Sequence, residues 1–298
     1  MLKIIIKRLL RPVAVMLGLT VKIAIQESDL SKSKLLIISF TGGMGAQILS
    51  AGILFHLKSK GYAVKADLDY FKKDCHVATI GNKGEVSHWD WQLDDYGLTI
   101  EKIKSYGEQL YHRNADTYYL PDGQLKARLA MLALRDIEVK KQFKMPQIDK
   151  IVSSCPELQL LYTSQQPYIC IHIRRGDYVN VASHIVSNDE FVQLAEKFKN
   201  LVNSVVVVSD SLLGDEFKDQ LRLQFRRAVF LDGSIVSPFV THCVMRNSNI
   251  LVCSNSQYSL TAGVLNEGLV IIPKVWLGPG HEKLEAEIEK LYDFAVLG

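Results

Sequence analysis

The sequence has little of what holds small secreted or zinc-binding proteins together. Its five cysteines are odd in number and form no Cys-x-x-Cys pair, and no Asn-x-Ser/Thr sequence occurs. These absences disfavour a disulfide-linked secreted scaffold and a zinc ribbon, and they predict reduced thiols in the cytoplasm. The eight histidines form no His-x-His or His-Glu-x-x-His pair. We therefore expect no metal site.

The chain also lacks a large excess of charge of either sign. Its 298 residues include 35 Lys and Arg against 32 Asp and Glu, which gives a formal net charge of +3. Hydrophobic residues make up 48% and charged residues 22%, which excludes a disordered chain and fits one or two globular domains. Residues 1–25 carry +5, so the remainder carries −2. For a body of that charge we expect no nucleic-acid partner.

No hydrophobic run is long enough to cross a bilayer, although residues 1–33 form a basic, apolar arm. The run from Val13 to Val21 has nine residues, whereas a spanning helix needs ~20. Lys3, Lys7 and Arg11 recur every four residues among Ile and Leu, which places them on one face of a helix. Three interpretations stay open: an arm on the inner membrane surface, a helix docked on the body, and a signal peptide without a small-residue cleavage site.

Beyond the arm, strand and helix patterns alternate. The apolar run Leu35–Phe40, a glycine-rich turn, a helical pattern over 46–60 and the run Ala63–Leu68 predict one βαβ unit. The next segment is less regular, with helices expected near 99–109 and over 126–144. Five further apolar runs predict strands separated by helices: Tyr168–Ile173, Ser204–Ser209, Ala228–Leu231, Asn249–Cys253 and Leu269–Ile272.

This alternation predicts parallel sheets that are covered by helices on both faces. We therefore expect an α/β protein with two Rossmann-like βα domains facing a cleft, preceded by the arm. Proline punctuation near residue 160 places the domains at 34–160 and 161–298. Ligands of such sheets bind at the carboxyl ends of the strands.

One loop at a predicted strand end carries paired arginines. The strand at 168–173 continues into Arg174-Arg175-Gly176-Asp177. Two guanidinium groups at a strand end suit a dianionic group, because each presents forked donors to phosphate oxygens. Gly176 allows a tight turn, and Asp177 can hold an arginine or accept a hydrogen bond. The alternative interpretation is an Arg-Asp turn on the surface.

A second polar segment follows the predicted strand at 249–253. Ser and Asn residues run into a helix at 254–256, where they cap the helix and leave N–H groups that attract anions. With the arginines this segment is a candidate pyrophosphate clamp, and without them it is a capped helix. Ser209-Asp210 follows another strand at the same edge, with a helix cap as its alternative. The turn Gly42–Gly45 lacks the Lys-Ser/Thr of a P-loop.

Five segments together resemble a known family. His172–Tyr178 resembles the HxRRxD signature of α-1,2- and α-1,6-fucosyltransferases, and its Gly-Asp-Tyr looks most like the α-1,2 family. Four other segments resemble that family in the right order along the chain: Gly42–Gln47, Gln92–Tyr96, Val207–Asp210 and Asn255–Ser259. The resemblance covers roughly residues 35 to 275.

The resemblance implies a GT-B-type fold, GDP-fucose as donor, and inversion at the sugar carbon without a metal or other cofactor. It implies that Arg174 holds the β-phosphate of the leaving GDP, with Arg174 and Asp177 as the catalytic residues. It places Gly43, Gly45 and Gln47 near the acceptor or the cleft. Eight residues are expected to bind the donor: His172, Arg174, Arg175, Ser209, Asp210, Asn255, Ser256 and Ser259.

The chain departs from the family pattern in three places. The family usually has Asn where this chain has Ala46, and an aromatic-rich run where this chain has Ile48–Ala51. Its Ser-x-Phe-Ser-Trp-Trp pattern is replaced over Ser256–Thr261. These departures leave open a GDP-colitose-type donor, or a non-catalytic nucleotide- or glycan-binding homologue. The expectation is α-1,2 transfer of L-fucose or a related 6-deoxyhexose to galactose in bacterial O-antigen or capsule synthesis. A lipid-linked acceptor at the inner membrane would then agree with the basic arm.

Overall fold

The structure is a computed structural model. It describes residues 35–71, 90–103, 117–120, 124–145, 151, 153, 155–163, 166–176, 185–233, 236–273, 286, 292 and 294–297. The predicted arm at 1–33 and the predicted catalytic Asp177 lie outside these residues. Among the residues described, no helix combines the length and apolar character needed to span a membrane.

The first half contains a three-stranded parallel sheet in the order β2-β1-β3. The central strand β1 (Leu35–Ser39) runs through a glycine-rich turn into α3 (Met44–Ser59), which leads to β2 (Val64–Asp67). This βαβ unit confirms the prediction from the apolar runs. The third strand, β3 (Thr117–Leu120), pairs with the other edge of β1.

Two predictions for the first half are wrong. The helix expected near 99–109 is not helical over its described part, because Lys102 forms a parallel bridge with Ala66 beside β2. The single helix expected over 126–144 is divided into α4 (Gln124–Ala133) and α5 (Ile137–Lys140). Asp136 begins the second helix by accepting a hydrogen bond from Glu138 N at 2.9 Å. Among the described residues, short 3-10 helices also occur at Asp69–Phe71 (η1), Asp94–Tyr96 (η3) and Pro156–Leu158 (η5).

The second half contains a six-stranded parallel sheet in the order β6-β5-β4-β7-β8-β9. If β4 is counted as the first strand, this is the 3-2-1-4-5-6 order of doubly wound nucleotide-binding sheets. In such a sheet, successive strands are added first on one side of β4 and then, from β7 onward, on its other side. Its strands are β4 (Tyr168–Ile173), β5 (Ser204–Ser209), β6 (Arg227–Leu231), β7 (Ile250–Val252), β8 (Leu269–Pro273) and β9 (Ala295–Leu297). The helices are α7 (Gln159–Thr163), α8 (Asn188–Glu196), α9 (Asp215–Gln224), α10 (Pro238–Arg246) and α11 (Gln257–Leu265).

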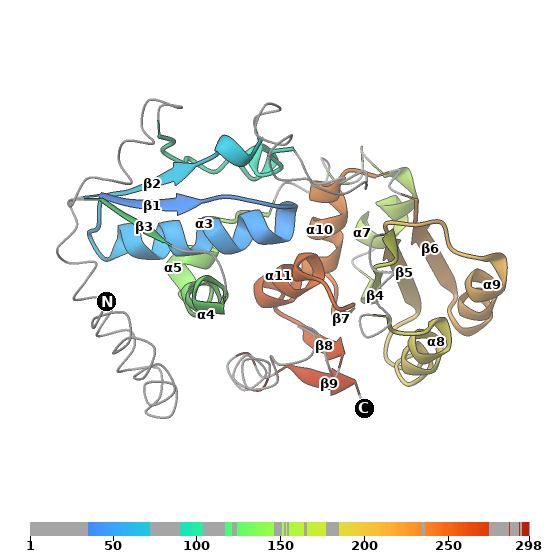
Figure 1. The fold of residues 1–298 in the computed structure, drawn as a ribbon. Helices are drawn as coiled ribbons and strands as arrows, with labels where there is room; N and C mark the ends of the chain where they lie inside the picture. The colour runs from blue at the N-terminus through green and yellow to red at the C-terminus, as the bar shows by residue number, and fades with distance from the viewer. Residues whose placement is uncertain are drawn as a thin grey trace.

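Alternate residues of the central strands enter two different hydrophobic cores. Ile169 and Ile171 of β4 pack with α8 and α9 on one face of the sheet, whereas Cys170 packs with α10 and α11 on the other. Because successive strand residues point to opposite faces, a strand that is apolar throughout suits this double burial. Figure 1 shows α10 and α11 between the two sheets, with α8 and α9 on the far side. The predicted α/β fold with two Rossmann-like units is therefore confirmed.

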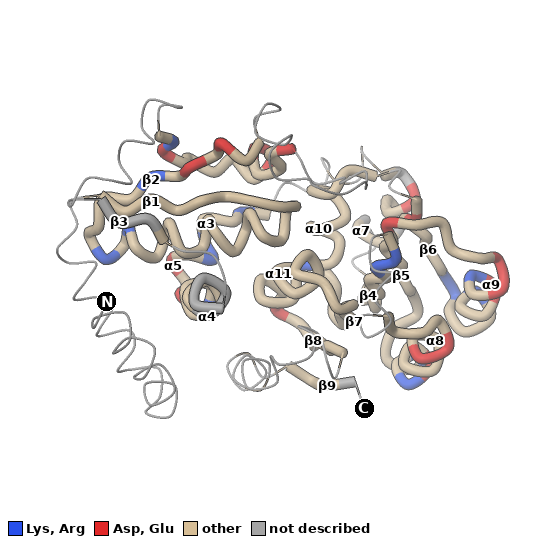
Figure 2. Tube along the Cα trace, in the orientation of Figure 1, with Lys and Arg blue, Asp and Glu red and all other residues tan. Residues whose placement is uncertain are grey.

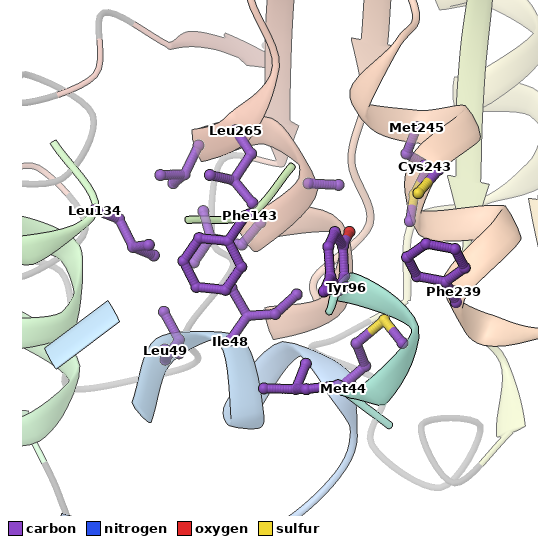
Figure 3. Close-up of a cluster of buried hydrophobic side chains, with 14 of the residues drawn as sticks. Met44, Ile48, Leu49, Tyr96, Leu134, Phe143, Phe239, Cys243, Met245 and Leu265 are labelled. Carbon is purple, nitrogen blue, oxygen red and sulfur yellow. The ribbon is translucent and has the colours of Figure 1, made fainter. Parts of the chain in front are cut away.

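The two halves share one continuous core. Met44 and Ile48 of α3 belong to the same buried cluster as Tyr96, Phe239 and Leu265 (Figure 3). The helices that meet there carry almost no charge: α3, α10 and α11 contain Lys58 and Arg246 as their only Lys, Arg, Asp or Glu residues (Figure 2). The domain ranges 34–160 and 161–298 stay a prediction, as does a cleft between them, and each range contains one of the sheets.

The backbones of α3 and α11 come into contact where the two halves meet. A Cβ atom added to Gly45 would lie 2.6 Å from the backbone carbon of Gln257 and 2.6 Å from Tyr258 N. Such distances are far inside van der Waals contact, so only glycine allows the first turns of the two helices to meet. Glycine at position 45 is thus required by packing between the halves.

Candidate functional site

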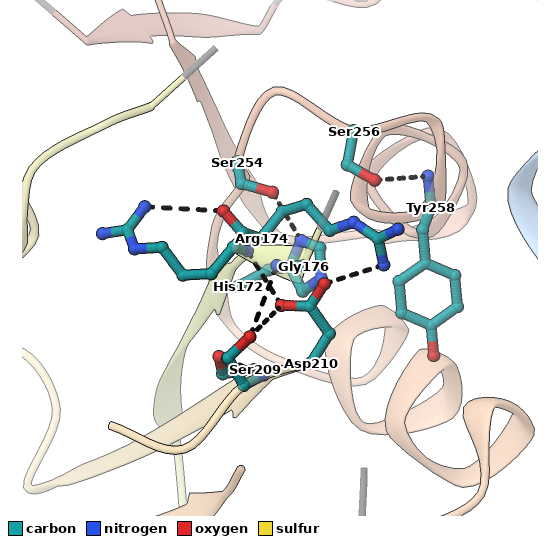
Figure 4. Close-up of polar contacts among 10 residues, drawn as sticks. His172, Arg174, Gly176, Ser209, Asp210, Ser254, Ser256 and Tyr258 are labelled. Carbon is teal, nitrogen blue, oxygen red and sulfur yellow. Dashed lines mark hydrogen bonds and ion pairs between the residues drawn. The ribbon is translucent and has the colours of Figure 1, made fainter. Parts of the chain in front are cut away.

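The polar strand ends predicted from the sequence meet at one edge of the six-stranded sheet. Parallel pairing aligns Ile173 with Ser209, and Ile171 with Val252, so the loops after β4, β5 and β7 leave the sheet side by side. This edge flanks the position where the strand order changes direction, which is where doubly wound sheets bind ligands. Figure 4 shows the side chains that gather there, including Arg174.

Arg174 is held at this edge by Asp210. Its Nη1 atom lies 2.9 Å from Asp210 Oδ2, and the two side chains are only 16% and 18% exposed. The other carboxylate oxygen of Asp210 accepts a hydrogen bond from Arg175 N at 2.8 Å. A Cβ atom added to Gly176 would lie 2.5 Å from Asp210 Oδ2. A side chain at position 176 would therefore crowd the carboxylate that faces Arg174.

Arg175 turns away from Arg174, although both were expected to bind the donor. Its Nη2 atom donates to Val186 O and to Asn188 Oδ1, each at 2.8 Å, at the start of α8. Burial lowers the pKa of Arg175, and the nearby Asp210 carboxylate opposes that change. The side chain of Arg175 thus ties the loop to the start of α8, whereas the side chain of Arg174 faces Asp210.

His172 is buried beneath the loop and joins it to the segment after β7. Its Nδ1 atom pairs with Ser254 Oγ at 2.7 Å. Burial, with a smaller contribution from the charge of Arg174, lowers the pKa of His172 to about 3. The imidazole is therefore neutral near pH 7. It connects β4 to the segment that begins α11.

Two serines at the amino end of α11 have different roles. Ser256 is the N-cap, and its hydroxyl accepts a hydrogen bond from Tyr258 N at 3.2 Å. The hydroxyl of Ser259 is fully buried and donates to Ser254 O and Ser256 O at 3.2 and 3.3 Å. Ser259 therefore stabilises the loop itself, and Asn255 is also buried at 2% exposure.

Ser209 belongs to the turn that carries Asp210. It is 3% exposed, and its hydroxyl accepts a hydrogen bond from Ser211 N at 3.2 Å. The hydroxyl of Ser211 accepts in turn from Gly176 N at 3.3 Å, which joins the turn after β5 to the arginine loop after β4. The predicted helix-cap alternative does not hold, since α9 begins later with Gly214 as its N-cap.

Gln47, expected near the acceptor or the cleft, is completely buried. Its Nε2 atom donates to Gly42 O and Asp90 O, both at 2.9 Å, and its Oε1 atom accepts from Gln92 N at 2.9 Å. Gln47 thus holds the segment 90–92 against the start of α3. Gly43 is the N-cap of the same helix.

A buried polar network beside the site was missed by the sequence analysis. The ring of His242, on α10, pairs through Nδ1 with Tyr96 Oη at 2.5 Å and through Nε2 with Thr261 Oγ1 at 3.2 Å. Burial lowers the pKa of His242 well below its usual value, and the charges of Arg246 and His172 add to this effect. The only signal in the sequence was the presence of polar residues in otherwise apolar helices.

Two acidic residues at the end of β2 form a sequence that can bind a metal ion, so they test the expectation of no metal site. Asp67-Leu68-Asp69 is an Asp-x-Asp sequence at the end of β2, which that expectation overlooked. Asp69 N donates to Asp67 Oδ1 at 2.9 Å, so this pair forms a local turn. Over the described residues, no group of three or more His, Cys, Asp or Glu side chains is arranged to hold a metal ion.

A model described as Glycosyl transferase family 11 matches residues 112–292, a range that contains the arginine loop, α10 and α11. This agrees with the family predicted from the motifs. Curated protein sequences give no match.

Several solved structures are similar in fold. POFUT1 in complex with GDP is 12% identical with a TM-score of 0.45, over 80% of this chain and 95% of that one. Fucosyltransferase NodZ from Bradyrhizobium is 12% identical with a TM-score of 0.43, over 79% and 93%. ADP-heptose LPS heptosyltransferase II from E. coli is 14% identical with a TM-score of 0.43, over 80% and 84%.

Proposed function

Because the chain belongs to glycosyl transferase family 11, we propose that it moves L-fucose, or a related 6-deoxyhexose, from a GDP-sugar to a glycan hydroxyl. The observation that carries this proposal is the position of Arg174 at the carboxyl end of β4. There it follows the strand that is joined to the β7–α11 segment through the His172–Ser254 hydrogen bond. A guanidinium group and a capped helix start at one sheet edge suit a pyrophosphate.

In this proposal Arg174 acts on the leaving group. Departure of GDP builds negative charge on the β-phosphate, and Arg174 with the N–H groups of α11 would stabilise that charge as it develops. The ion pair with Asp210, at 2.9 Å, holds the guanidinium in place before the donor binds. Donors that are already oriented stabilise a transition state without the free-energy cost of reorganisation.

Asp210 is better suited to orienting Arg174 than to taking a proton from the acceptor. One of its carboxylate oxygens faces Arg174 and the other accepts from Arg175 N. This leaves Asp177, three residues after Arg174, as the sequence candidate for the general base. We propose an inverting displacement in which the acceptor hydroxyl attacks the sugar carbon from the face opposite GDP.

The proposed reaction uses no metal, because Arg174 and the amino end of α11 would supply the positive potential at the leaving group. The proposed acceptor is a galactose residue, linked α-1,2, in the assembly of a bacterial O-antigen or capsule. Residues 1–25, with their charge of +5, would bring a cytoplasmic enzyme to a lipid-linked acceptor at the inner membrane.

A donor and acceptor panel tests this function. Release of the nucleoside diphosphate is measured with GDP-fucose, GDP-colitose and, as the control donor, UDP-galactose, each with and without a soluble β-galactoside, and each with and without EDTA. We expect acceptor-dependent GDP release from a GDP-6-deoxyhexose that EDTA does not change. Release that EDTA abolishes and Mn²⁺ restores would overturn the metal-independent account. GDP binding without any transfer would favour the non-catalytic homologue.

A further inference from the structure

Tyr258, in the first turn of α11, packs between two buried histidines. Its ring centroid lies 5.4 Å from that of His172 and 5.2 Å from that of His242. His172 belongs to β4, two residues before Arg174, and His242 belongs to α10. The tyrosine ring therefore connects the strand that carries the arginine to the helix that faces the first half.

The hydroxyl of Tyr258 holds the side chain in place through hydrogen bonds to α10. It donates to Pro238 O and lies 2.6 Å from Thr241 Oγ1, so it is bonded to the first turn of α10. The backbone of Tyr258 is held as well, because its N–H donates to the N-cap hydroxyl of Ser256. A phenylalanine would keep the ring contacts and lose the bonds to α10.

The network extends from α10 into the first half of the chain. His242 bonds Tyr96 of η3, and the start of α3 is in backbone contact with Tyr258 through Gly45. The first turn of α11 is thus held from three directions: by β4, by α10 and by α3. Two of the hydroxyls involved, on Tyr258 and Thr261, stand where the family pattern has Phe and Trp.

We propose that Tyr258 is a positioning residue for anion binding: its hydroxyl fixes the amino end of α11, with the N-cap Ser256, opposite Arg174. The inference rests on the proposed binding of GDP at this edge. Helix N–H groups stabilise an anion only at hydrogen-bond distance, so a small shift of the first turn away from Arg174 reduces their contribution. Loss of the Tyr258 hydroxyl should therefore both increase the mobility of the first turn of α11 and lower the affinity for GDP.

Replacement of Tyr258 by phenylalanine tests the role of the hydroxyl alone. We expect Tyr258→Phe to weaken GDP binding about tenfold in a calorimetric titration, which is about the free-energy contribution of one hydrogen bond. We also expect faster amide hydrogen exchange over residues 257–261. The matched control is Tyr162→Phe, which removes a different tyrosine hydroxyl, paired at 3.2 Å with Oη of Tyr168, the first residue of β4. The control should lower thermal stability while leaving both measurements unchanged.

Three outcomes decide the matter. A Tyr258→Phe variant with unchanged GDP affinity and unchanged exchange overturns the proposal. Equal loss of affinity in Tyr162→Phe also overturns it, because a general softening of the core would then be the cause. If the unmodified protein binds no GDP, the proposed function fails. The exchange comparison then still decides whether the hydroxyl fixes α11.

Discussion

Arg174 and Arg175 are neighbours with separate roles, and this shows what the sequence can predict at the scale of single residues. Their position after a buried strand placed both at the correct sheet edge. The direction of each side chain depends on partners far along the chain, Asp210 for one and Asn188 for the other. Ser259 and Gln47 show the same limit, since their polar atoms are used inside the fold.

The role of Arg174 leads to a prediction for a conservative change. Arg174→Lys should lower kcat/KM by about 100-fold or more, as removal of one transition-state donor does. A lysine ammonium is a point charge and cannot present two parallel donors to phosphate while it faces Asp210. Steady-state GDP release measures the loss, and the far-UV circular dichroism spectrum should be unchanged.

The matched control for this variant is Arg222→Lys. Arg222 lies on α9 and forms an exposed ion pair with Asp219 at 2.8 Å, so its replacement should leave activity as it was. Full activity of Arg174→Lys would show that the forked guanidinium is not needed. The assignment of Arg174 to the leaving group would then be wrong.

At the scale of elements, the buried strands were the most predictable. β4 and β5 have the bounds predicted for them, because both are apolar runs buried on both faces. β3 was missed, since Thr117–Leu120 has neither a long apolar run nor an alternating pattern. The break between α4 and α5 was missed because Asp136 acts as a cap only in the local geometry that the fold imposes.

The contact between α3 and α11 predicts a large effect of one added methyl group. Gly45→Ala would place a carbon 2.6 Å from backbone atoms of α11, and backbone cannot yield as a flexible side chain can. We expect the free energy of unfolding to fall by about 1–3 kcal/mol, the usual cost of overpacking. Urea denaturation measures this change.

Gly214→Ala is the control for Gly45→Ala. Gly214 has φ −66° and nothing within 4 Å of an added Cβ, so its replacement causes no clash. The weaker N-cap that alanine makes should be largely offset by the lower conformational entropy of the unfolded chain, so stability should change by less than about 1 kcal/mol. If the two variants are equally stable, α3 and α11 are not in the close contact described.

At the scale of the whole molecule, two buried histidines make stability depend on pH. In the unfolded chain each histidine has a pKa near 6.5, whereas burial lowers the pKa of His172 to about 3 and that of His242 well below its usual value. Below about pH 6.5 the unfolded chain therefore binds protons that the folded chain does not. Each histidine should reduce the free energy of unfolding by about 1.4 kcal/mol per pH unit.

Urea denaturation between about pH 7.5 and pH 5 tests this dependence, because most carboxylates stay ionised over that range. His242→Gln should remove about half of the slope. A free energy of unfolding that stays constant across the range would show that both histidines are protonated in the folded protein.

The proposed membrane role of the basic arm gives a prediction for the intact chain. The full-length protein should cosediment with anionic vesicles at low salt and be released at high salt, since each basic residue contributes about 1 kcal/mol near such a surface. Deletion of residues 1–25 should abolish cosedimentation while transfer to a soluble acceptor continues. Aggregation of the truncated protein would instead identify the arm as a helix docked on the body.

During synthesis on the ribosome, residues of α3 emerge long before the residues of α10 and α11 with which they share a core. Met44, Ile48 and Leu49 pack in one cluster with Phe239 and Leu265. Roughly 190 residues separate these partners, which at about 5–20 residues per second is roughly 10–40 s of translation. During that interval the apolar side of α3 lacks the surface that finally covers it. We therefore expect the nascent chain to bind chaperones, and a translational pause before residue 239 to prolong the time in which it can aggregate.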